Sequence, residues 1–295
     1  MIYLSLTKPR LSSFVVLSAA AGYLMAPAPL SVPQLAATVV GTALTVASAN
    51  AGNQWLEADY DKLMQRTRLR ALPRELLAPS SALAFAAACG VGGTTLLWHA
   101  VNPIAAMLAG GNILLYVGVY TPMKRVHWSN TWIGAVVGAV PPLVGWTAAT
   151  GGAFGAGAWA LFAVLYAWQI PHFLSLSWTI RHDYARGGYE MMARHFAHKV
   201  APQTFLWSLY TLPLGACCAL AGIATPLFAL TSLAPGVPLV FAANRFARDR
   251  SNANSRTVFK WTLAWLPTFL ALLLLHKRAP SDDVPAYDWQ QTSKK

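Results

Sequence analysis

The chain has 295 residues, of which 56% are apolar and only 11% charged, and its formal net charge is +12. This balance excludes an ordinary soluble domain and indicates an integral membrane protein. A basic excess can also indicate a nucleic-acid-binding protein. Here the Lys and Arg residues lie in short segments between apolar runs, so a lipid bilayer explains them and no nucleic-acid partner is expected.

Nine apolar runs are long enough to cross a bilayer, and each is expected to be a helix because hydrocarbon offers no partners to backbone polar groups. Their approximate bounds are 11–28, 34–52, 77–98, 102–120, 131–150, 156–180, 204–223, 226–244 and 258–276. Their many small residues favour close packing. Four prolines are expected to kink or interrupt their helices: Pro141, Pro142, Pro171 and Pro213. The predicted protein is an all-α transmembrane domain over residues 1–277 with a polar tail over 278–295.

The basic residues predict the orientation of these helices. The N-terminus and the segments after every second run carry 18 of the 22 Lys and Arg residues, and the alternate segments carry none. By the positive-inside rule the basic face is the cytoplasm or the mitochondrial matrix.

An acidic cluster ends the second run, in the string N-Q-W-L-E-A-D-Y-D over residues 53–61. In a helix, Asn53, Glu57 and Asp61 fall four residues apart and line one face. Oxygen ligands of this kind suit Mg²⁺, which takes few carboxylates and completes its shell with water and substrate phosphates. The alternative is a helix end with a solvated charge cluster, balanced by the arginines that follow.

A second polar segment, from Trp168 to Met192, reaches the same face. His172 lies inside the sixth run, and Asp183 follows that run in the chain. A lone histidine on an apolar face is more often a core residue than a ligand. Basic groups facing a few carboxylates nevertheless form an arrangement that binds a diphosphate with its metal.

Several strings together resemble the UbiA-type intramembrane prenyltransferases, and within them the branch that farnesylates haem. They are the 53–61 motif with its R-T-R-L-R tail, Y-T-P-M-K-R at 120–125, N-T-W-I-G-A-V-V-G-A-V-P-P at 130–142, G-W-T-A-A-T-G at 145–151, W-Q-I-P-H-F at 168–173 and D-Y-A-R-G-G-Y-E-M-M at 183–192. The resemblance runs from about Lys8 to about Lys277 and is closest to the mitochondrial enzymes. It implies nine transmembrane helices around a central cavity.

The resemblance also implies a reaction, in which a farnesyl group passes from farnesyl diphosphate to a vinyl group of haem B to give haem O, a step toward haem A and cytochrome c oxidase. The implied Mg²⁺ ligands, which are also the catalytic residues, are Asn53, Glu57, Asp61 and Asp183. The implied diphosphate-binding residues are Lys62, Arg66, Arg70, Lys124, Arg125 and Arg186. His172 is the expected haem contact. The implied setting is the mitochondrial inner membrane with the active-site loops in the matrix, or else a bacterial plasma membrane, and the product is expected to pass to a haem A synthase.

The chain departs from the family pattern in three ways. His182 stands where relatives often carry a second acid, and neutral imidazole is a poor Mg²⁺ ligand. Asp59 is an additional acid, expected to pair with nearby arginines. No targeting peptide is recognisable before the first run, which leaves a bacterial source open. Two other functions also stay open: prenylation of a quinone-precursor ring, and transport of an anion or haem without catalysis.

Overall fold

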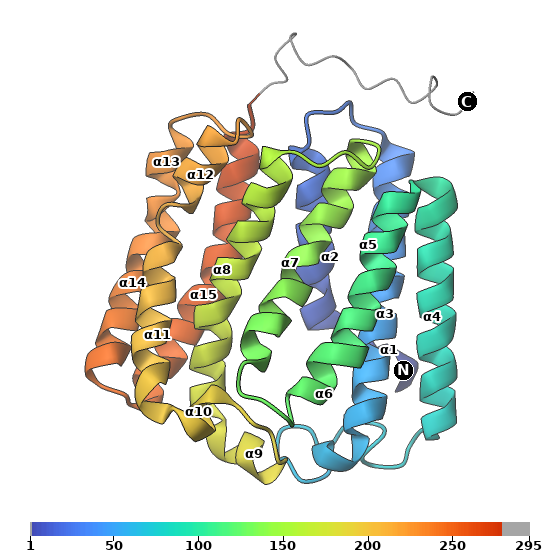
Figure 1. Ribbon diagram of the computed structural model, residues 1–295, viewed down its shortest axis with the longest axis vertical. Helices are drawn as coiled ribbons and strands as arrows, with labels where there is room; N and C mark the ends of the chain where they lie inside the picture. Colours follow the sequence, from blue (N-terminus) through green and yellow to red (C-terminus); the bar gives the residue numbers. More distant parts are fainter. Residues whose placement is uncertain (1, 279–295) are drawn as a thin grey trace.

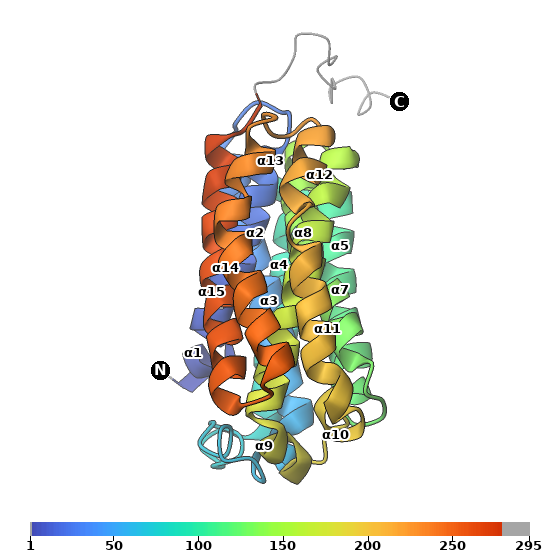
Figure 2. The same ribbon diagram turned by 90° about the vertical axis from the view of Figure 1, so that its left-hand side faces the viewer.

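The computed structural model describes residues 2–278, and they form an almost entirely helical bundle (Figure 1). The predicted tail therefore lies outside the described residues, apart from Arg278. The helices run nearly parallel to the long axis of the molecule (Figure 2). Their bounds are α1 Ile2–Leu6, α2 Pro9–Met25, α3 Val32–Asp61, α4 Pro79–Ala100, α5 Pro103–Leu114, the π-helical turn η1 Leu115–Tyr120, α6 Thr121–Met123, α7 Asn130–Ala149, α8 Ala156–Thr179, α9 Arg181–Arg186, α10 Met192–His195, α11 Ala197–Tyr210, α12 Leu214–Leu220, α13 Phe228–Thr231, α14 Leu233–Arg248 and α15 Asn252–Leu275.

All nine predicted runs coincide with helices. Within residues 2–278, six helical stretches are long and apolar enough to cross a membrane: α3, α4, α5 to α6, α7, α8 and α15. The first run is α2, which has 17 residues. The seventh run is divided between α11 and α12, and the eighth between α13 and α14. Large apolar side chains such as Leu114, Phe241 and Val91 point outward, as expected for a surface in contact with lipid.

Proline has different effects at different positions in these helices. The helices α2, α3, α4 and α5 each carry a proline in their first turn, where its missing N–H has no bond to lose. Pro213 lies between α11 and α12, at the predicted interruption. Of the predicted kink or interruption, an interruption does not occur in α7 or α8, which continue through their prolines. In α7 the carbonyl of Val137, which Pro141 cannot bond, accepts a hydrogen bond of 3.0 Å from Asn112 Nδ2 instead.

Glycines allow α2 and α7 to pack closely, as the many small residues of the apolar runs predicted. A Cβ on Gly22 would overlap the carbonyl oxygen of Pro142, and one on Gly145 would overlap that of Ala19, so α2 and α7 touch backbone to backbone. Helix α3 packs against α2 and α4. Helix α8 packs against α7, α11 and α15.

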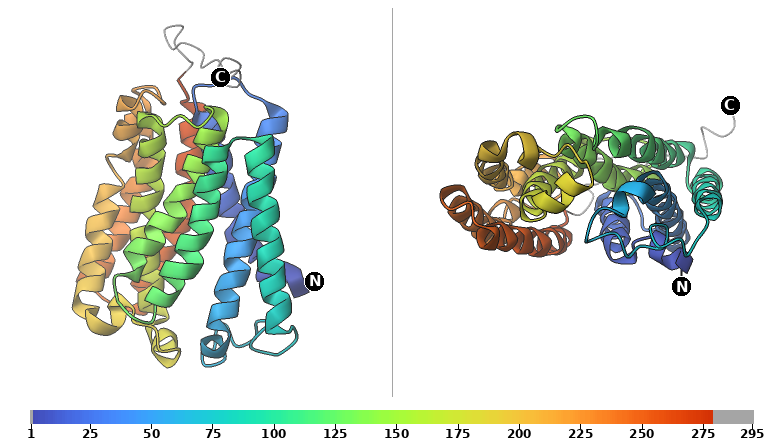
Figure 3. Two further views of the ribbon diagram at one scale, coloured as in Figure 1. Left: turned by 45° about the vertical axis from the view of Figure 1, so that its right-hand side comes forward. Right: turned by 90° about the horizontal axis from the view of Figure 1, so that it is seen from below.

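The basic segments lie at one end of the bundle. The chain from α3 to α4, the turn from α6 to α7 and the helices α9 and α10 all lie at the lower end in Figure 1. The view from below shows the end of α3 beside α9 (Figure 3, right). The two predicted polar segments, about 120 residues apart in the chain, therefore meet at the end that carries the basic residues.

Candidate active site

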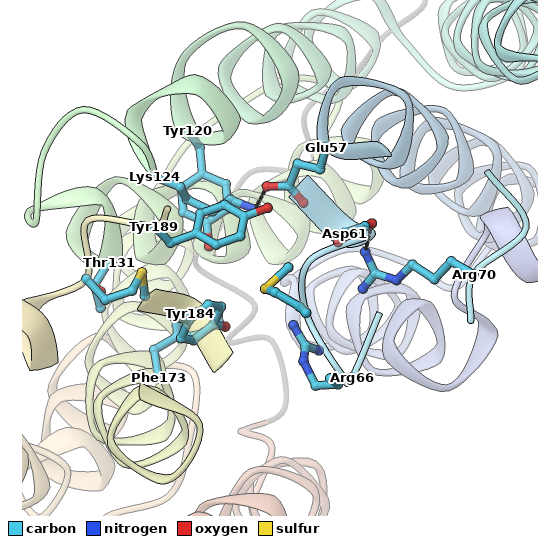
Figure 4. Close-up of a pocket in the computed structure, with 12 residues that line it drawn as sticks. Glu57, Asp61, Arg66, Arg70, Tyr120, Lys124, Thr131, Phe173, Tyr184 and Tyr189 are labelled. Carbon is cyan, nitrogen blue, oxygen red and sulfur yellow. Dashed lines mark hydrogen bonds and ion pairs between the residues drawn. The ribbon is translucent and has the colours of Figure 1, made fainter. Parts of the chain in front are cut away.

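A pocket opens at this end of the bundle (Figure 4). Its walls come from α3, the turn after α3, the end of α6, α7, α8 and the segment from α9 to α10. The lining residues are Glu57, Asp61, Met64, Arg66, Arg70, Tyr120, Lys124, Thr131, Phe173, Tyr184, Tyr189 and Met191. The lining combines charged groups with aromatic rings.

Three oxygen-bearing side chains lie along one face of α3, as the four-residue spacing predicted. Asn53, Glu57 and Asp61 are 1%, 5% and 0% exposed. Charged groups rarely become this buried without partners. The three side chains follow α3 back from its end into the bundle. Their burial contradicts the alternative of a solvated helix end.

Each of these side chains is paired with a cation from another segment. Lys124 Nζ lies 2.6 Å from Glu57 Oε1, and Arg70 Nη1 lies 2.6 Å from Asp61 Oδ2. Lys8 Nζ donates to Asn53 Oδ1 at 2.8 Å. The first two of these pairs line the pocket, where Arg66 adds a third cation.

The backbone geometry of Lys8 is unusual for a lysine. Its φ of 49° places it in the left-handed region, immediately before α2. This turn directs the side chain across to α3. Lysine at φ > 0 is energetically unfavourable, so the surrounding contacts must hold it there.

Burial and charge shift the pKa values of two basic groups at this site. Burial disfavours the charged form of Lys124, but the Glu57 carboxylate more than offsets this effect and raises the pKa of Lys124. Burial, reinforced by the nearby Arg70 guanidinium, lowers the pKa of Lys8 to about 7. Lys124 is therefore a permanent cation, whereas Lys8 changes its charge near neutral pH.

Asp183 reaches the same end of the bundle but does not line the pocket. Its two carboxylate oxygens accept hydrogen bonds from the backbone N–H groups of Gln65 at 2.7 Å and Arg66 at 3.2 Å. It thereby fixes the turn that follows Asp61. No cluster of three or more His, Cys, Asp or Glu residues that could hold a metal is found within residues 2–278.

The side-chain oxygens of Asn53, Glu57 and Asp61 fit a hard cation such as Mg²⁺. Asp61 Oδ1 is buried and has no hydrogen-bond partner within the described part of the chain. Glu57 and Asp61 are one helical turn apart and Asn53 adds an amide oxygen. Mg²⁺ commonly uses one or two carboxylates with waters and substrate phosphates, so this set is sufficient for it.

The structure divides the six predicted diphosphate-binding residues into two groups. Arg66, Arg70 and Lys124 line the pocket. The other three do not: Lys62 pairs with Asp59 and Glu75 at the surface, Arg125 stacks on the ring of Tyr60 at 3.5 Å, and Arg186 is exposed. Asp59, which was expected to pair with arginines, pairs with Lys62 at 3.5 Å instead.

His172 lies at the contact of α8 with α15 and not in the pocket lining, to which its neighbour Phe173 belongs. Its ring is stacked between Trp168 and Phe259, with centroid distances of 5.0 and 4.7 Å. Its Nδ1 lies 2.9 Å from Thr262 Oγ1.

Sequence reasoning missed several residues of this site. Lys8 was counted only as one of the basic residues of the N-terminal segment, three residues before the first apolar run. Four aromatic residues of the lining were also missed: Tyr120, Phe173, Tyr184 and Tyr189. All four belong to the strings Y-T-P-M-K-R, W-Q-I-P-H-F and D-Y-A-R-G-G-Y-E-M-M, so their place in those strings was the available signal.

Comparisons with known proteins agree with this architecture. The family model described as the UbiA prenyltransferase family matches residues 15–264. The human protein named "Protoheme IX farnesyltransferase, mitochondrial" is 41% identical over 273 residues, which cover 92% of this chain and 61% of the relative. The chain spans about three fifths of the length of the curated relatives it matches.

Solved structures share the fold at low sequence identity. A digeranylgeranylglyceryl phosphate synthase superposes with a TM-score of 0.77 at 14% identity, covering 93% of this chain and 97% of that one. A UbiA homologue from Archaeoglobus fulgidus, solved with GPP and Mg²⁺ bound, gives 0.71 at 16% identity, covering 92% and 99%. Because the family model spans most of the helical bundle and the fold is the same throughout, the chain belongs to the UbiA prenyltransferase family.

Proposed function

We propose that this chain transfers a farnesyl group from farnesyl diphosphate to a vinyl group of haem B, giving haem O. The observation that carries the proposal is the pocket in which Glu57 and Asp61 face Arg66, Arg70 and Lys124 beside an apolar bundle. Carboxylates for a metal next to cations for phosphate are what a prenyl diphosphate requires. The names of the relatives that are about 40% identical supply the farnesyl donor and the haem acceptor.

Asn53, Glu57, Asp61 and Asp183 are the proposed Mg²⁺ ligands. Bound there, Mg²⁺ would stabilise the negative charge that builds up on the departing diphosphate. The first three belong to α3 and are buried, which supports this assignment. Asp183 accepts the amides of Gln65 and Arg66 and does not line the pocket, so we assign it first to holding that turn.

Arg66, Arg70 and Lys124 are the proposed partners of the diphosphate. Lys124 and Arg70 now neutralise Glu57 and Asp61, so an incoming metal–diphosphate would exchange one set of ion pairs for another. Such an exchange keeps every buried charge compensated. Lys62, Arg125 and Arg186 were predicted for the same role, and from their surface positions they would act by attracting the anionic donor.

The chemistry requires that the C1–O bond of the donor breaks with both electrons going to the diphosphate. The allylic cation is then attacked by the vinyl π electrons of haem B. Water adds to the resulting cation and gives up a proton, which leaves the hydroxyethylfarnesyl group. The rings of Tyr120, Phe173 and Tyr184 in the lining would stabilise the allylic cation and exclude bulk water.

His172 is the proposed haem contact, and its hydrogen bonds define its tautomer. Thr262 Oγ1 donates its proton to the carbonyl of Phe259 at 2.6 Å, so it must accept from Nδ1–H of His172. Nε2 is then unprotonated, and within residues 2–278 it has no hydrogen-bond partner. An imidazole held at Nδ1 with a free Nε2 lone pair is suited to ligating haem iron.

The proposed location is the mitochondrial inner membrane, with the pocket facing the matrix and haem O passing to a haem A synthase. The support is the word "mitochondrial" in the relatives' names, the apolar helices and the one-sided distribution of basic residues.

The proposal is tested by expressing the chain in cells that make haem B but no farnesylated haem. Mass spectrometry of the extracted haem should show haem O in these cells and none in cells expressing Asp61→Asn. A product found only on aromatic acids would favour ring prenylation instead, and passage of haem without pyrophosphate release would favour a carrier.

A further inference from the structure

Tyr189 is a buried residue of the pocket for which the proposed reaction has so far no role. Its side chain comes from the segment between α9 and α10 and lies beside the Lys124–Glu57 pair (Figure 4). The residue is 2% exposed, and its hydroxyl lies beside the Glu57 carboxylate, but within residues 2–278 it makes no hydrogen bond of normal geometry. A buried hydroxyl without a partner is costly, so its retention in a pocket indicates a ligand group that completes it.

The backbone around Tyr189 is held in place from several directions. Gly188 has a φ of 71°, which glycine adopts without strain, and the N–H of Tyr189 then donates to the carbonyl of Tyr184 at 3.0 Å. The next residue, Glu190, donates its N–H to the carbonyl of Lys124 at 2.7 Å. Its own carbonyl accepts from Asn130 Nδ2 at 2.9 Å. Tyr189 is therefore positioned by the same segment that carries the cation Lys124.

The phenol of Tyr189 stays protonated at any working pH. Burial and the neighbouring Glu57 carboxylate raise the pKa of Tyr189 above its usual range. The hydroxyl is thus a hydrogen-bond donor, next to a cation whose Nζ lies 5.8 Å from the Tyr189 ring centroid. A donor and a cation placed side by side are complementary to a phosphate oxygen.

We infer that Tyr189 is a catalytic residue whose hydroxyl donates a hydrogen bond to the diphosphate of the prenyl donor. The inference rests on the proposed function, because it takes the donor from there. As the C1–O bond breaks, its electron pair moves to the diphosphate, and the hydrogen bond strengthens as the charge on the oxygen grows. The proton stays on the phenol throughout, so no further acid or base is needed.

The test compares Tyr189→Phe with Tyr210→Phe, a matched removal of a phenol hydroxyl from a tyrosine that is 48% exposed on α11, outside the pocket lining. Binding of inorganic pyrophosphate with Mg²⁺ is measured by calorimetry on the purified full chain. We expect Tyr189→Phe to bind it roughly 10-fold to 100-fold more weakly, the range for a hydrogen bond to a charged group. Tyr210→Phe should bind like the wild type.

Thermal unfolding without ligand separates this role from a structural one. Losing an unsatisfied hydroxyl should leave the Tyr189→Phe protein as stable as the wild type or more stable, whereas losing a structural hydrogen bond would destabilise it. Pyrophosphate affinity and turnover within twofold of the wild type would overturn the inference, as would a wild type that binds no Mg²⁺–pyrophosphate. If the wild type makes no farnesylated haem while Tyr189→Phe still weakens pyrophosphate binding, the proposed acceptor is wrong and the role of Tyr189 stands.

Discussion

Lys124 and Glu57, 67 residues apart in the chain, form an ion pair of 2.6 Å with side chains only 12% and 6% exposed. The pair joins the end of α6 to the ligand face of α3. Its two partners should be strongly coupled, because removing either one leaves the other charge buried and uncompensated. We expect Glu57→Gln and Lys124→Met each to destabilise the protein by about 3 kcal/mol, and the double variant by much less than the sum. A double-mutant cycle of unfolding free energies measures this coupling, and simple additivity would contradict it.

Asp61 and Asp59 offer a matched pair of carboxylates two residues apart at the end of α3. Asp61 is fully buried and paired with Arg70, whereas the side chain of Asp59 is 87% exposed. Asp61→Asn should abolish haem O formation, because it removes a metal ligand and leaves Arg70 without its counter-charge. Asp59→Asn should keep near-normal turnover and a stability within about 0.5 kcal/mol of the wild type. Equal effects of the two substitutions on product formation would refute the assignment.

Lys8 predicts a pH dependence of stability. Its folded pKa of about 7 lies below that of an unfolded lysine, so between pH 7 and about 10 the unfolded chain binds more protons than the folded one. Stability should therefore rise with pH across this window, by up to about 1.4 kcal/mol per pH unit from this group. The check is to measure the free energy of unfolding of the wild type and of Lys8→Met from pH 6 to 9. The rise with pH should be smaller in the variant. An equal dependence of unfolding free energy on pH in the two proteins would contradict a lowered pKa of Lys8.

Thr262 is predicted to control haem binding through His172. Thr262→Val preserves the shape of the side chain but leaves Nδ1–H of His172 without an acceptor, so the ring loses its fixed orientation. We expect haem affinity to fall about tenfold, as for other residues that orient a metal ligand, and Thr262→Ser to restore it. The absorption spectrum of added haem reports this directly. Ligation that survives unchanged in His172→Ala would exclude His172 as the iron ligand.

Asp183 is predicted to fix the turn after Asp61. Asp183→Asn replaces a carboxylate that accepts two backbone hydrogen bonds, so the turn should open more readily by about 1–3 kcal/mol. Hydrogen exchange at the amides of Gln65 and Arg66 should accelerate, and turnover should fall because Arg66 lines the pocket. Unchanged exchange together with lost Mg²⁺ binding would instead make Asp183 a metal ligand only.

Much of the fold could be predicted because its signals are local. Apolar runs of spanning length, and basic residues in alternate segments, identify the helices and the end at which their polar segments gather. The four-residue spacing likewise places Asn53, Glu57 and Asp61 on one face, since a single helix determines it.

The parts that could not be predicted depend on how separate segments turn relative to one another. Lys124 and Arg125 are adjacent, yet one enters the pocket and the other stacks on Tyr60, because the end of α6 determines which one points inward. The same holds for His172 and Phe173 on α8. The segment of Tyr189 is held at the pocket by hydrogen bonds of its neighbour Glu190 with the Lys124 carbonyl and with Asn130 Nδ2, both at least 60 residues away in the chain. The rotation of one helix relative to its neighbours cannot be read from the sequence. The sequence therefore identifies the segments that form a site but not each side chain that faces into it.

The central requirement of the proposed function is that a prenyl diphosphate is held and cleaved in this pocket with haem as the acceptor. The direct measurement is a reaction of purified chain, farnesyl diphosphate, Mg²⁺ and haem B in lipid, in which pyrophosphate and haem O are counted together. We predict equal amounts of both from the wild type and neither from Asp61→Asn. Pyrophosphate without any farnesylated haem, or haem O formed at a normal rate by Asp61→Asn, would contradict it.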